Sequence, residues 1–214
     1  MKLIDIATWK RREHFQHFSG LDDPYWSIST ALDCSNTWRD SKKKGESFFL
    51  HCLFRSLVAA NKVEELRLRI VKGQVVCFSR VHASATVLRS DETFGCSFIE
   101  YLDDFSAFAA SAAKSIEETK LRSGMCLDQD YRADQIYYSS IPWHHFTGLT
   151  YAKSFNSEDS VPRITFGKVF QQGKRKMLPV SIQVHHGLAD GLHVSRFLEH
   201  FQNLLKMTCS DFSL

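Results

Sequence analysis

A regular alternation, followed by a histidine-containing turn and an amphipathic segment, sets the strongest constraint on the fold. In residues 177–186 the apolar side chains Val180, Ile182 and Val184 share one parity. Because side chains alternate across a strand, this segment predicts a β-strand with one apolar face. Residues 192–206 repeat apolar side chains at helical spacing and predict a helix. The chain therefore joins a strand to a helix through a short turn near its C-terminus.

The turn between these two elements reads H-H-x-x-x-D-G and begins at His185. By parity, His186 falls on the apolar face of the strand and His185 on the polar face. Loss of solvent there favours the neutral imidazole, which is the form that a general base needs at neutral pH. His186 is therefore a candidate base and Asp190 a candidate anchor for the turn. A lone histidine on an apolar face is more often a hydrogen-bonded core residue, so this motif alone leaves both interpretations open.

The composition is that of a globular protein with a substantial core. The 214 residues are 43% hydrophobic and include 17 phenylalanines. This fits one domain over residues 1–214, with an aromatic-rich interior or a pocket for a flat, apolar ligand. The net charge is only +3, so no nucleic-acid partner is expected. Two short basic clusters, residues 42–44 and 174–176, are expected in solvated loops, with contact to ligand phosphates as the alternative.

Cysteine usage and hydropathy indicate a soluble protein in the cytoplasm. The six cysteines show no C-x-x-C spacing and several lie in apolar runs, which is typical of reduced thiols that pack as small hydrophobes. Residues 1–12 contain no apolar signal-peptide core. The chain has no run of 18 apolar residues, so no membrane contact is expected.

Periodicity and capping signals predict the remaining elements. Helices are expected at residues 9–18, 47–62 and 103–122, with Ser47 as an N-cap. Strands are expected at residues 26–34, 82–88, 94–101, 135–139, 146–152 and 162–170, a hairpin over 67–79 with its turn at Lys72 and Gly73, and a polar loop over 171–176. This order predicts an α+β fold, in which helices pack on one face of a mixed, mostly antiparallel β-sheet.

Four further motifs along the chain, taken together with the turn, closely resemble the chloramphenicol acetyltransferase family. They are W-x-R-R-E-H-F from Trp9, E-T-F from Glu92, S-x-x-P-W from Ser139 and T-x-G-K from Thr165. The turn itself extends the pattern as L-P-x-x-I-Q-V-H-H-x-x-x-D-G-x-H-V from Leu178. H-H-x-x-x-D-G alone also occurs in dihydrolipoamide acyltransferase cores and peptide-synthetase condensation domains. The order and spacing of the motifs over residues 9–197 make the resemblance specific.

The resemblance implies the fold of coenzyme A-dependent acyltransferases and a homotrimer with active sites at its subunit interfaces. It implies an O-acetyltransferase that uses acetyl-CoA as co-substrate, needs no metal and acetylates a hydroxyl of chloramphenicol, the chemistry of antibiotic resistance. His186 matches the family's general base, Ser139 the serine that stabilises the oxyanion, and Thr165 the threonine that positions a water molecule. The chain has no G-x-S-x-G motif, which fits direct attack without an acyl-enzyme.

Further residues take roles by the same resemblance. Asp190 and Arg11 match a buried ion pair that supports the base, and Trp143 matches an aromatic residue near the coenzyme channel. The acceptor pocket would be lined by Phe18, Phe94, Cys96 and Leu149, with Cys126 and Tyr151 near it. Phe18 and Val169 stand where the family usually has tyrosine, so a different small hydroxylated acceptor is the alternative substrate.

Strand geometry favours a site shared between subunits. If Phe170 and Met177 close the last hairpin, Thr165 lies opposite Ile182. Four residues of strand, about 13 Å, then separate Thr165 from His186. A neighbouring subunit that supplies one of the two residues would remove this gap.

Three other functions are less well supported by the sequence. Acyl transfer to a carrier-bound thiol or amine has no carrier-binding domain to use in this chain. A non-catalytic trimer that binds an apolar ligand would not need His186, Ser139 and Thr165 together. A zinc site formed by His186, Asp190 and His193 lacks an evident fourth ligand.

Overall fold

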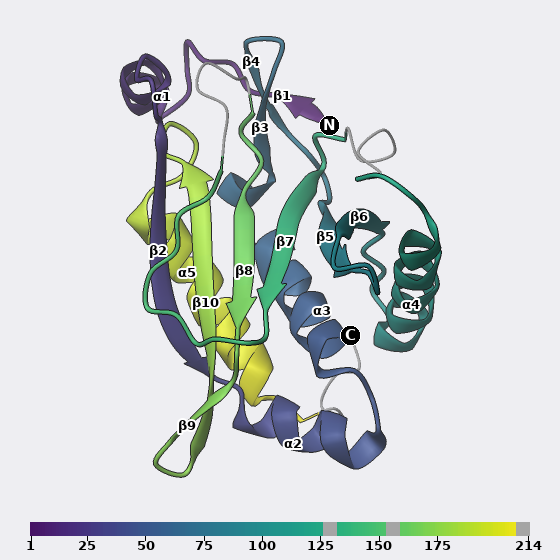
Figure 1. Ribbon diagram of the computed structural model, residues 1–214. Coiled ribbons are helices and arrows are strands. Elements are labelled where there is room, and N and C mark those ends of the chain that lie inside the picture. Colours follow the sequence, from purple (N-terminus) through teal and green to yellow (C-terminus); the bar gives the residue numbers. More distant parts are fainter. Residues whose placement is uncertain (126–131, 153–158, 209–214) are drawn as a thin grey trace.

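The computed structural model describes residues 1–125, 132–152 and 159–208. A seven-stranded sheet dominates it, with strand order β2-β10-β8-β7-β5-β6 and β9 beside β10 (Figure 1). The strands are β2 (Tyr25–Asp33), β5 (His82–Leu88), β6 (Phe94–Ile99), β7 (Gln135–Ile141), β8 (Arg163–Gly167), β9 (Phe170–Gln172) and β10 (Arg175–His185). The pairs β5–β7 and β7–β8 are parallel, whereas the other pairs are antiparallel. The predicted mixed, mostly antiparallel sheet is confirmed.

A smaller sheet stands at one end of the molecule. The strands β3 (Leu68–Val71) and β4 (Gln74–Cys77) form the predicted hairpin, and β1 (Lys2–Leu3), which was not predicted, adds a third strand beside β4. Lys72 and Gly73 have φ angles of 52° and 73°. Two successive positive φ angles give the tight turn that matches the twist of antiparallel strands.

Helices pack mainly on one face of the large sheet. They are α1 (Arg12–Ser19), α2 (Ser35–Lys44), α3 (Phe48–Asn61), α4 (Phe105–Leu121) and α5 (Gly191–Lys206), with a short 3-10 helix at Glu64–Arg67 before β3. The Ser47 hydroxyl caps α3 by accepting the Leu50 amide N–H at 3.4 Å. The α2 helix was not predicted because its sequence is largely polar, and it ends at Gly45, whose φ is 68°.

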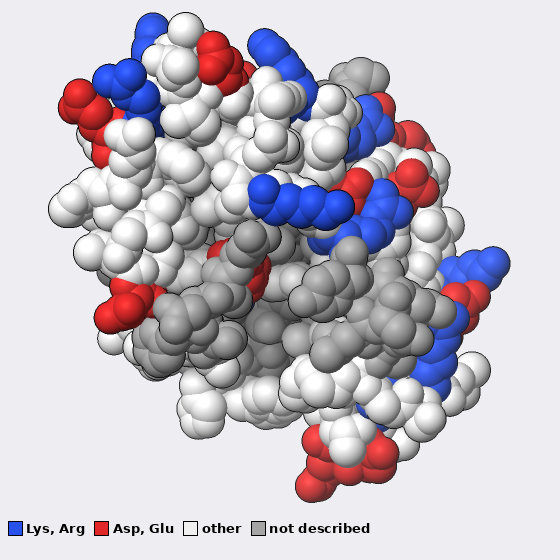
Figure 2. Space-filling view, turned by 90° about the horizontal axis from the view of Figure 1, so that it is seen from above, with Lys and Arg blue, Asp and Glu red and all other residues white. Residues whose placement is uncertain are grey.

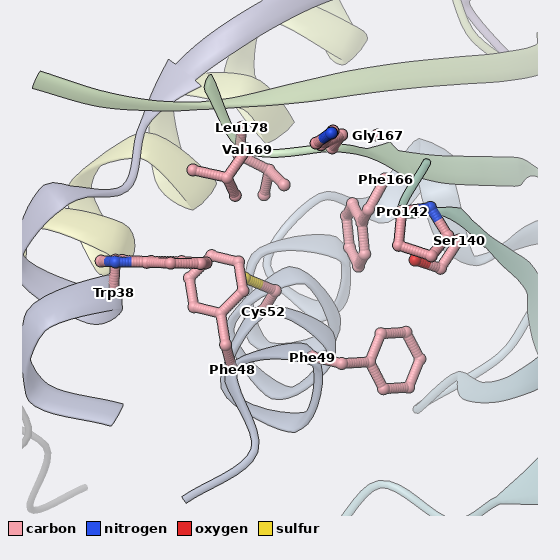
Figure 3. Close-up of a pocket in the computed structure, with 11 residues that line it drawn as sticks. Trp38, Phe48, Phe49, Cys52, Ser140, Pro142, Phe166, Gly167, Val169 and Leu178 are labelled. Atoms are coloured by element: carbon pink, nitrogen blue, oxygen red, sulfur yellow. The ribbon is translucent and has the colours of Figure 1, made fainter. Parts of the chain in front are cut away.

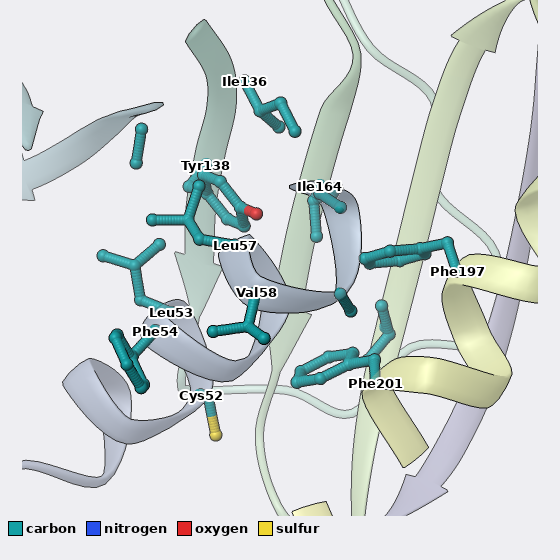
Figure 4. Packing of buried hydrophobic residues seen from close by; sticks show 14 of the residues in the cluster. Cys52, Leu53, Phe54, Leu57, Val58, Ile136, Tyr138, Ile164, Phe197 and Phe201 are labelled. Carbon is teal, nitrogen blue, oxygen red and sulfur yellow. The ribbon is translucent and has the colours of Figure 1, made fainter. Parts of the chain in front are cut away.

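The main core lies between α3, α5 and the sheet (Figure 4). The buried apolar residues of α5 have spacings of three or four, so this helix turns one apolar stripe to the core, whereas α3 is buried on all sides from Leu50 to Ala60. These core residues include Leu53, Leu57, Val58, Phe197 and Phe201 from the helices and Ile136, Tyr138 and Ile164 from the strands. This packing fixes the ends of β7, β8 and β10, where the candidate site residues lie.

The segment after β7 departs from the prediction. Residues 146–152 form no strand, and the chain after β7 instead crosses the sheet face opposite α3 and α5 (Figure 1). Its Tyr151 hydroxyl donates to Thr165 Oγ1 at 3.1 Å, so a side chain replaces the expected backbone pairing. A Cβ at Gly167 would lie 2.9 Å from the Phe146 ring. At this point the Lys168 N–H donates to the His144 carbonyl at 2.8 Å, and the predicted strand 162–170 is divided into β8 and β9.

The state of the cysteines and the hydropathy of the helices can be compared with the sequence-based expectations. Cys34, Cys52 and Cys77 are buried, Cys96 is half-buried, and all four are free thiols. Cys126 and Cys209 lie outside the described residues. Within the described residues, no helix combines the length and the apolar character needed to cross a membrane.

Candidate active site

The H-H-x-x-x-D-G turn links β10 to α5 through a compact set of backbone hydrogen bonds. The N–H groups of Leu188 and Ala189 both donate to the His185 carbonyl at 3.0 Å. The Asp190 carboxylate caps α5 by accepting the Leu192 N–H at 3.1 Å. The turn therefore holds a fixed backbone path, as expected of a segment that must present one side chain.

His186 leaves the strand and lies among aromatic rings. Its ring stacks on Phe18, with centroids 3.8 Å apart and planes 9° apart, and Trp26 approaches at 5.7 Å. The Nδ1 atom is buried and has no hydrogen-bond partner among the described residues. The ring is half-buried as a whole, so Nε2 is the nitrogen left to meet a ligand.

The structure reverses the expected burial of the two histidines. His185, assigned to the polar side, is only 4% exposed. Burial lowers the pKa of its imidazole to about 4, and the neighbouring His186 acts in the same direction. The parity argument was wrong because β10 ends at His185 and is buried on both faces, including Ser181 and Gln183.

A fall in pH is expected to destabilise the folded chain through His185. Between its ordinary pKa of about 6.5 and the folded value, the unfolded chain binds a proton that the folded chain does not. Stability therefore falls as the pH drops from about 6.5 towards 4. Burial also lowers the pKa of His51 and His82, so a His185→Gln variant should lose only part of this dependence. Urea unfolding of both proteins across this pH window measures the difference, and equal slopes would contradict the assignment to His185.

The predicted ion pair beneath the turn is present. Arg11 Nη1 lies 2.5 Å from Asp190 Oδ2, with side chains 12% and 30% exposed. Burial alone would raise the pKa of the Asp190 carboxyl, but the hydrogen bond from Arg11 and nearby charges outweigh it and the pKa is lowered. Arg11 Nη2 also donates to the His186 carbonyl at 3.1 Å. The ion pair thus reaches the backbone of the candidate base.

Ser139 and Thr165 form a second group. They are paired residues of the neighbouring parallel strands β7 and β8, and both line a cavity of about 680 Å³. The Thr86 hydroxyl donates to Ser139 Oγ at 3.4 Å. The Ser139 hydroxyl is therefore an acceptor in that contact and keeps its own proton for another partner.

Most of the remaining predicted residues surround the same cavity. Phe94, Leu149 and Tyr151 line it, and Trp143 lines it with 58% of its surface exposed. Cys96 pairs with Thr86 in the sheet but is not among the described lining residues. Phe18 stacks on His186 instead, and Cys126 lies outside the described residues.

The register separates the two groups further than the sequence predicted. Phe170 and Met177 do pair, although the pair that closes the hairpin is Gln172 and Arg175. Thr165 lies opposite Ser181, not Ile182. The interruption between β8 and β9 shifts the pairing by one residue. Five residues of strand, about 16 Å, therefore separate Thr165 from His186 along β10. Within one chain, the two groups of candidate residues therefore lie apart.

A second, aromatic cavity of about 350 Å³ adjoins the first (Figure 3). Phe49, Ser140 and Pro142 line both cavities. In Figure 3, Trp38 and Phe48 form one wall of this cavity, which sequence reasoning missed because α2 was not predicted. The Nζ atoms of Lys42 and Lys176 lie 5.1 and 5.9 Å from the centre of the Trp38 ring. Flat apolar surfaces next to cations suit a ligand that carries an aromatic ring and phosphates.

The face of the molecule seen in Figure 2, from above the view of Figure 1, carries charged side chains of both signs. Figure 2 shows basic and acidic side chains dispersed around a surface that is mostly uncharged. A nucleic-acid interface typically shows a basic patch on one face. The face seen in Figure 2 has no such patch among the described residues.

Comparison with known proteins gives one consistent family. The model of the chloramphenicol acetyltransferase family matches residues 1–202. The chain is 33% identical over 204 residues to a chloramphenicol acetyltransferase of Campylobacter coli, covering 94% of this chain and 97% of the relative. It is 30% identical over 204 residues to the corresponding protein of Clostridium perfringens, covering 94% and 93%.

Solved structures agree with this result. A chloramphenicol acetyltransferase superposes with a TM-score of 0.89 at 29% identity, covering 96% of this chain and 99% of that chain. The cubic core of the pyruvate dehydrogenase multienzyme complex, at 20% identity and a TM-score of 0.66, covers 89% of this chain and 85% of that one and shares the fold. Because the family model matches residues 1–202 of the 214 residues, the chain belongs to the chloramphenicol acetyltransferase family.

Proposed function

We propose that this protein transfers the acetyl group of acetyl-CoA to a hydroxyl of chloramphenicol in a ternary complex. The observation that carries the proposal is the presence of two separate reactive groups, His186 at the turn and Ser139 with Thr165 at the cavity, in a chain of this family. The named activity of the relatives supplies the substrate. Because the reaction consumes acetyl-CoA, we propose that it takes place in the cytoplasm. Because the reaction modifies the drug, we also propose that it confers antibiotic resistance.

His186 acts as the general base in this proposal. Its Nε2 takes the proton of the acceptor hydroxyl while that oxygen bonds to the thioester carbonyl carbon. The tetrahedral intermediate then expels the coenzyme A sulfur, which receives the proton from Nε2. An alcohol has a pKa far above 7, so a base acting during bond formation contributes about 10²–10⁴-fold.

Ser139 and Thr165 act on the intermediate. The Ser139 proton, not used in the contact with Thr86, is available to donate to the oxyanion. Thr165, hydrogen-bonded to Tyr151, is the residue proposed to hold a water molecule nearby. A donor that meets charge only as it develops stabilises the transition state more than the substrate.

The two adjoining cavities are proposed to hold the co-substrate. Acetyl-CoA contains an aromatic base, phosphates and a long thioester arm. The aromatic cavity with Trp38, Lys42 and Lys176 suits the base and phosphates. The larger cavity, with Trp143 at its exposed side and Phe94 and Leu149 among its lining residues, suits the acetyl end of that arm and the acceptor together, next to Ser139.

A homotrimer completes the proposed site. The separation between Thr165 and His186 along one chain supports a site in which another subunit supplies one of the two groups. The strand β2 lies at the sheet edge, and Leu21 and Ile28 are 46% and 41% exposed, so apolar surface for self-association is present. Edge strands and exposed apolar residues favour association with a second chain.

Two alternatives remain distinct from this proposal. Phe18 and Val169, where tyrosine is usual, support a different small hydroxylated acceptor. The aromatic lining would also suit a trimer that binds an apolar ligand without turnover.

A zinc site at His193 is disfavoured because its Nδ1 accepts the Asp190 N–H and its Nε2 lies 3.1 Å from Glu65 Oε1.

Release of free thiol from acetyl-CoA tests the activity. The purified chain is expected to release coenzyme A in the presence of chloramphenicol and to yield the acetylated drug by mass spectrometry. A panel of other small alcohols is assayed in parallel to identify a better acceptor. Calorimetric binding of chloramphenicol without thiol release would instead support the non-catalytic binder.

Mixed trimers test the shared site. Chains carrying His186→Ala and chains carrying Ser139→Ala are each expected to be inactive, but co-expression restores intact interfaces. A random mixture leaves one intact interface in each mixed trimer, so about a quarter of wild-type activity is expected. Activity of the mixture that stays at the level of the two parents would contradict a site shared between subunits.

A further inference from the structure

The peptide that joins His186 to Gly187 is held at both of its polar groups. Its carbonyl accepts the Arg11 Nη2–H at 3.1 Å, and its N–H donates to Nδ1 of His185, also at 3.1 Å. The N–H of His186 itself donates to the Pro24 carbonyl at 2.7 Å. Because the two peptide planes on either side of a residue fix its φ and ψ, these three bonds set the direction in which the His186 ring leaves the backbone.

The His185 ring is confined so that it can hold this bond. It is 4% exposed and meets the Tyr25 ring edge-on, with centroids 5.5 Å apart and planes 75° apart. A Cβ at Gly187 would lie 3.0 Å from Cε1 of His185 and 3.3 Å from the Cα of Phe15. The ring and the Gly187 backbone are therefore packed together, and Gly187 is the residue that permits this approach.

The hydrogen bond also defines the protonation state of His185. A nitrogen that accepts an N–H carries no proton, and a neutral imidazole accepts at one nitrogen and donates at the other. Burial lowers the pKa of His185 and keeps the ring neutral at physiological pH. Since its Nδ1 faces the Gly187 amide, His185 is suited to hold a backbone group and not to exchange protons with a substrate.

We propose that His185 is a positioning residue, whose Nδ1 holds the Gly187 amide and so orients the neighbouring His186 ring for acetyl transfer. This inference rests on the proposed function. Arg11 and His185 hold opposite sides of one peptide, one through a cation and one through a neutral acceptor. Loss of either contact leaves His186 present but free to turn away from the acceptor hydroxyl.

Two variants of His185 separate the acceptor from the volume of the ring. The shorter amide in His185→Asn would keep an oxygen about where Nδ1 lies, whereas the longer amide in His185→Gln reaches the position of Nε2. Both variants lose the contact with Tyr25, so their thermal stabilities should fall alike. His185→Gln is expected to lower kcat by about 10- to 100-fold. KM for acetyl-CoA and the acceptor should stay within about threefold, and His185→Asn should recover most of kcat.

Amide hydrogen exchange at Gly187 supplies a readout that needs no turnover. Protection is expected in the wild-type protein and in His185→Asn, and faster exchange in His185→Gln. Equal kcat values and equal Gly187 exchange in the two variants would overturn the inference. Failure of the proposed function is distinguishable, because it would show as absence of acetyl transfer in the wild-type protein itself.

Discussion

Replacement of His186 with alanine is expected to lower kcat by about 10²–10⁴-fold. The variant loses the only group proposed to take the acceptor proton as the new C–O bond forms. The ring is half-buried and stacks on Phe18 at the turn, whereas the main core lies between α3, α5 and the sheet. We therefore expect the variant to fold and to keep its oligomeric state. Steady-state kinetics of thiol release, together with sedimentation of the variant, measure both results.

A histidine far from the turn provides the matched control for this experiment. His200 lies on the exposed side of α5, so His200→Ala makes the same chemical change without altering the site. Its kcat should equal that of the wild-type protein. If His186→Ala kept wild-type turnover, another group would be the base. A loss of activity shared equally by both variants would point to a general defect instead.

Local patterns were sufficient to predict most of the fold. The alternation in residues 177–186 and the apolar stripe in residues 192–206 each describe one element and its buried side, and β10 and α5 lie where they predict. The α2 helix escaped prediction because polar residues such as Lys42 and Lys43 outnumber its buried positions. Contacts with α3 and α5 stabilise this helix, and hydrophobic periodicity within one segment cannot detect such contacts.

Local patterns did not predict the environment of the candidate site residues. The sequence motifs single out His186, Ser139 and Thr165 as candidates, but parity assigned the buried position to the wrong histidine. Parity assumes one buried and one solvated face, whereas the segment carrying Tyr151 crosses the second face. The register error has a similar origin, since the segment after β7 contacts the strand at Gly167 and its His144 carbonyl accepts the Lys168 N–H where β8 ends. Both errors come from contacts between segments that no local pattern describes.

Replacement of Ser139 with alanine is the second change with a large expected effect. The variant removes the hydroxyl proton proposed to meet the oxyanion, and loss of such a donor costs about 10²–10³-fold in kcat, or roughly 2.7–4 kcal/mol of transition-state stabilisation. KM for both substrates should change little, because the oxyanion to which the Ser139 hydroxyl donates does not exist before the intermediate forms. Thermal stability should change only slightly, since Ser139 is half-buried at the cavity.

A graded series separates donation to the oxyanion from simple packing at this position. Thr86→Val removes the hydroxyl that donates to Ser139 Oγ and frees Ser139 to rotate, so a smaller loss of kcat, below about tenfold, is expected. Ser106→Ala, on the exposed surface of α4, is the matched serine control and should leave kcat unchanged. A Ser139→Ala loss that appeared in KM and not in kcat would assign the hydroxyl to substrate binding. The order Ser139→Ala, Thr86→Val, Ser106→Ala in loss of kcat is the result that oxyanion stabilisation requires.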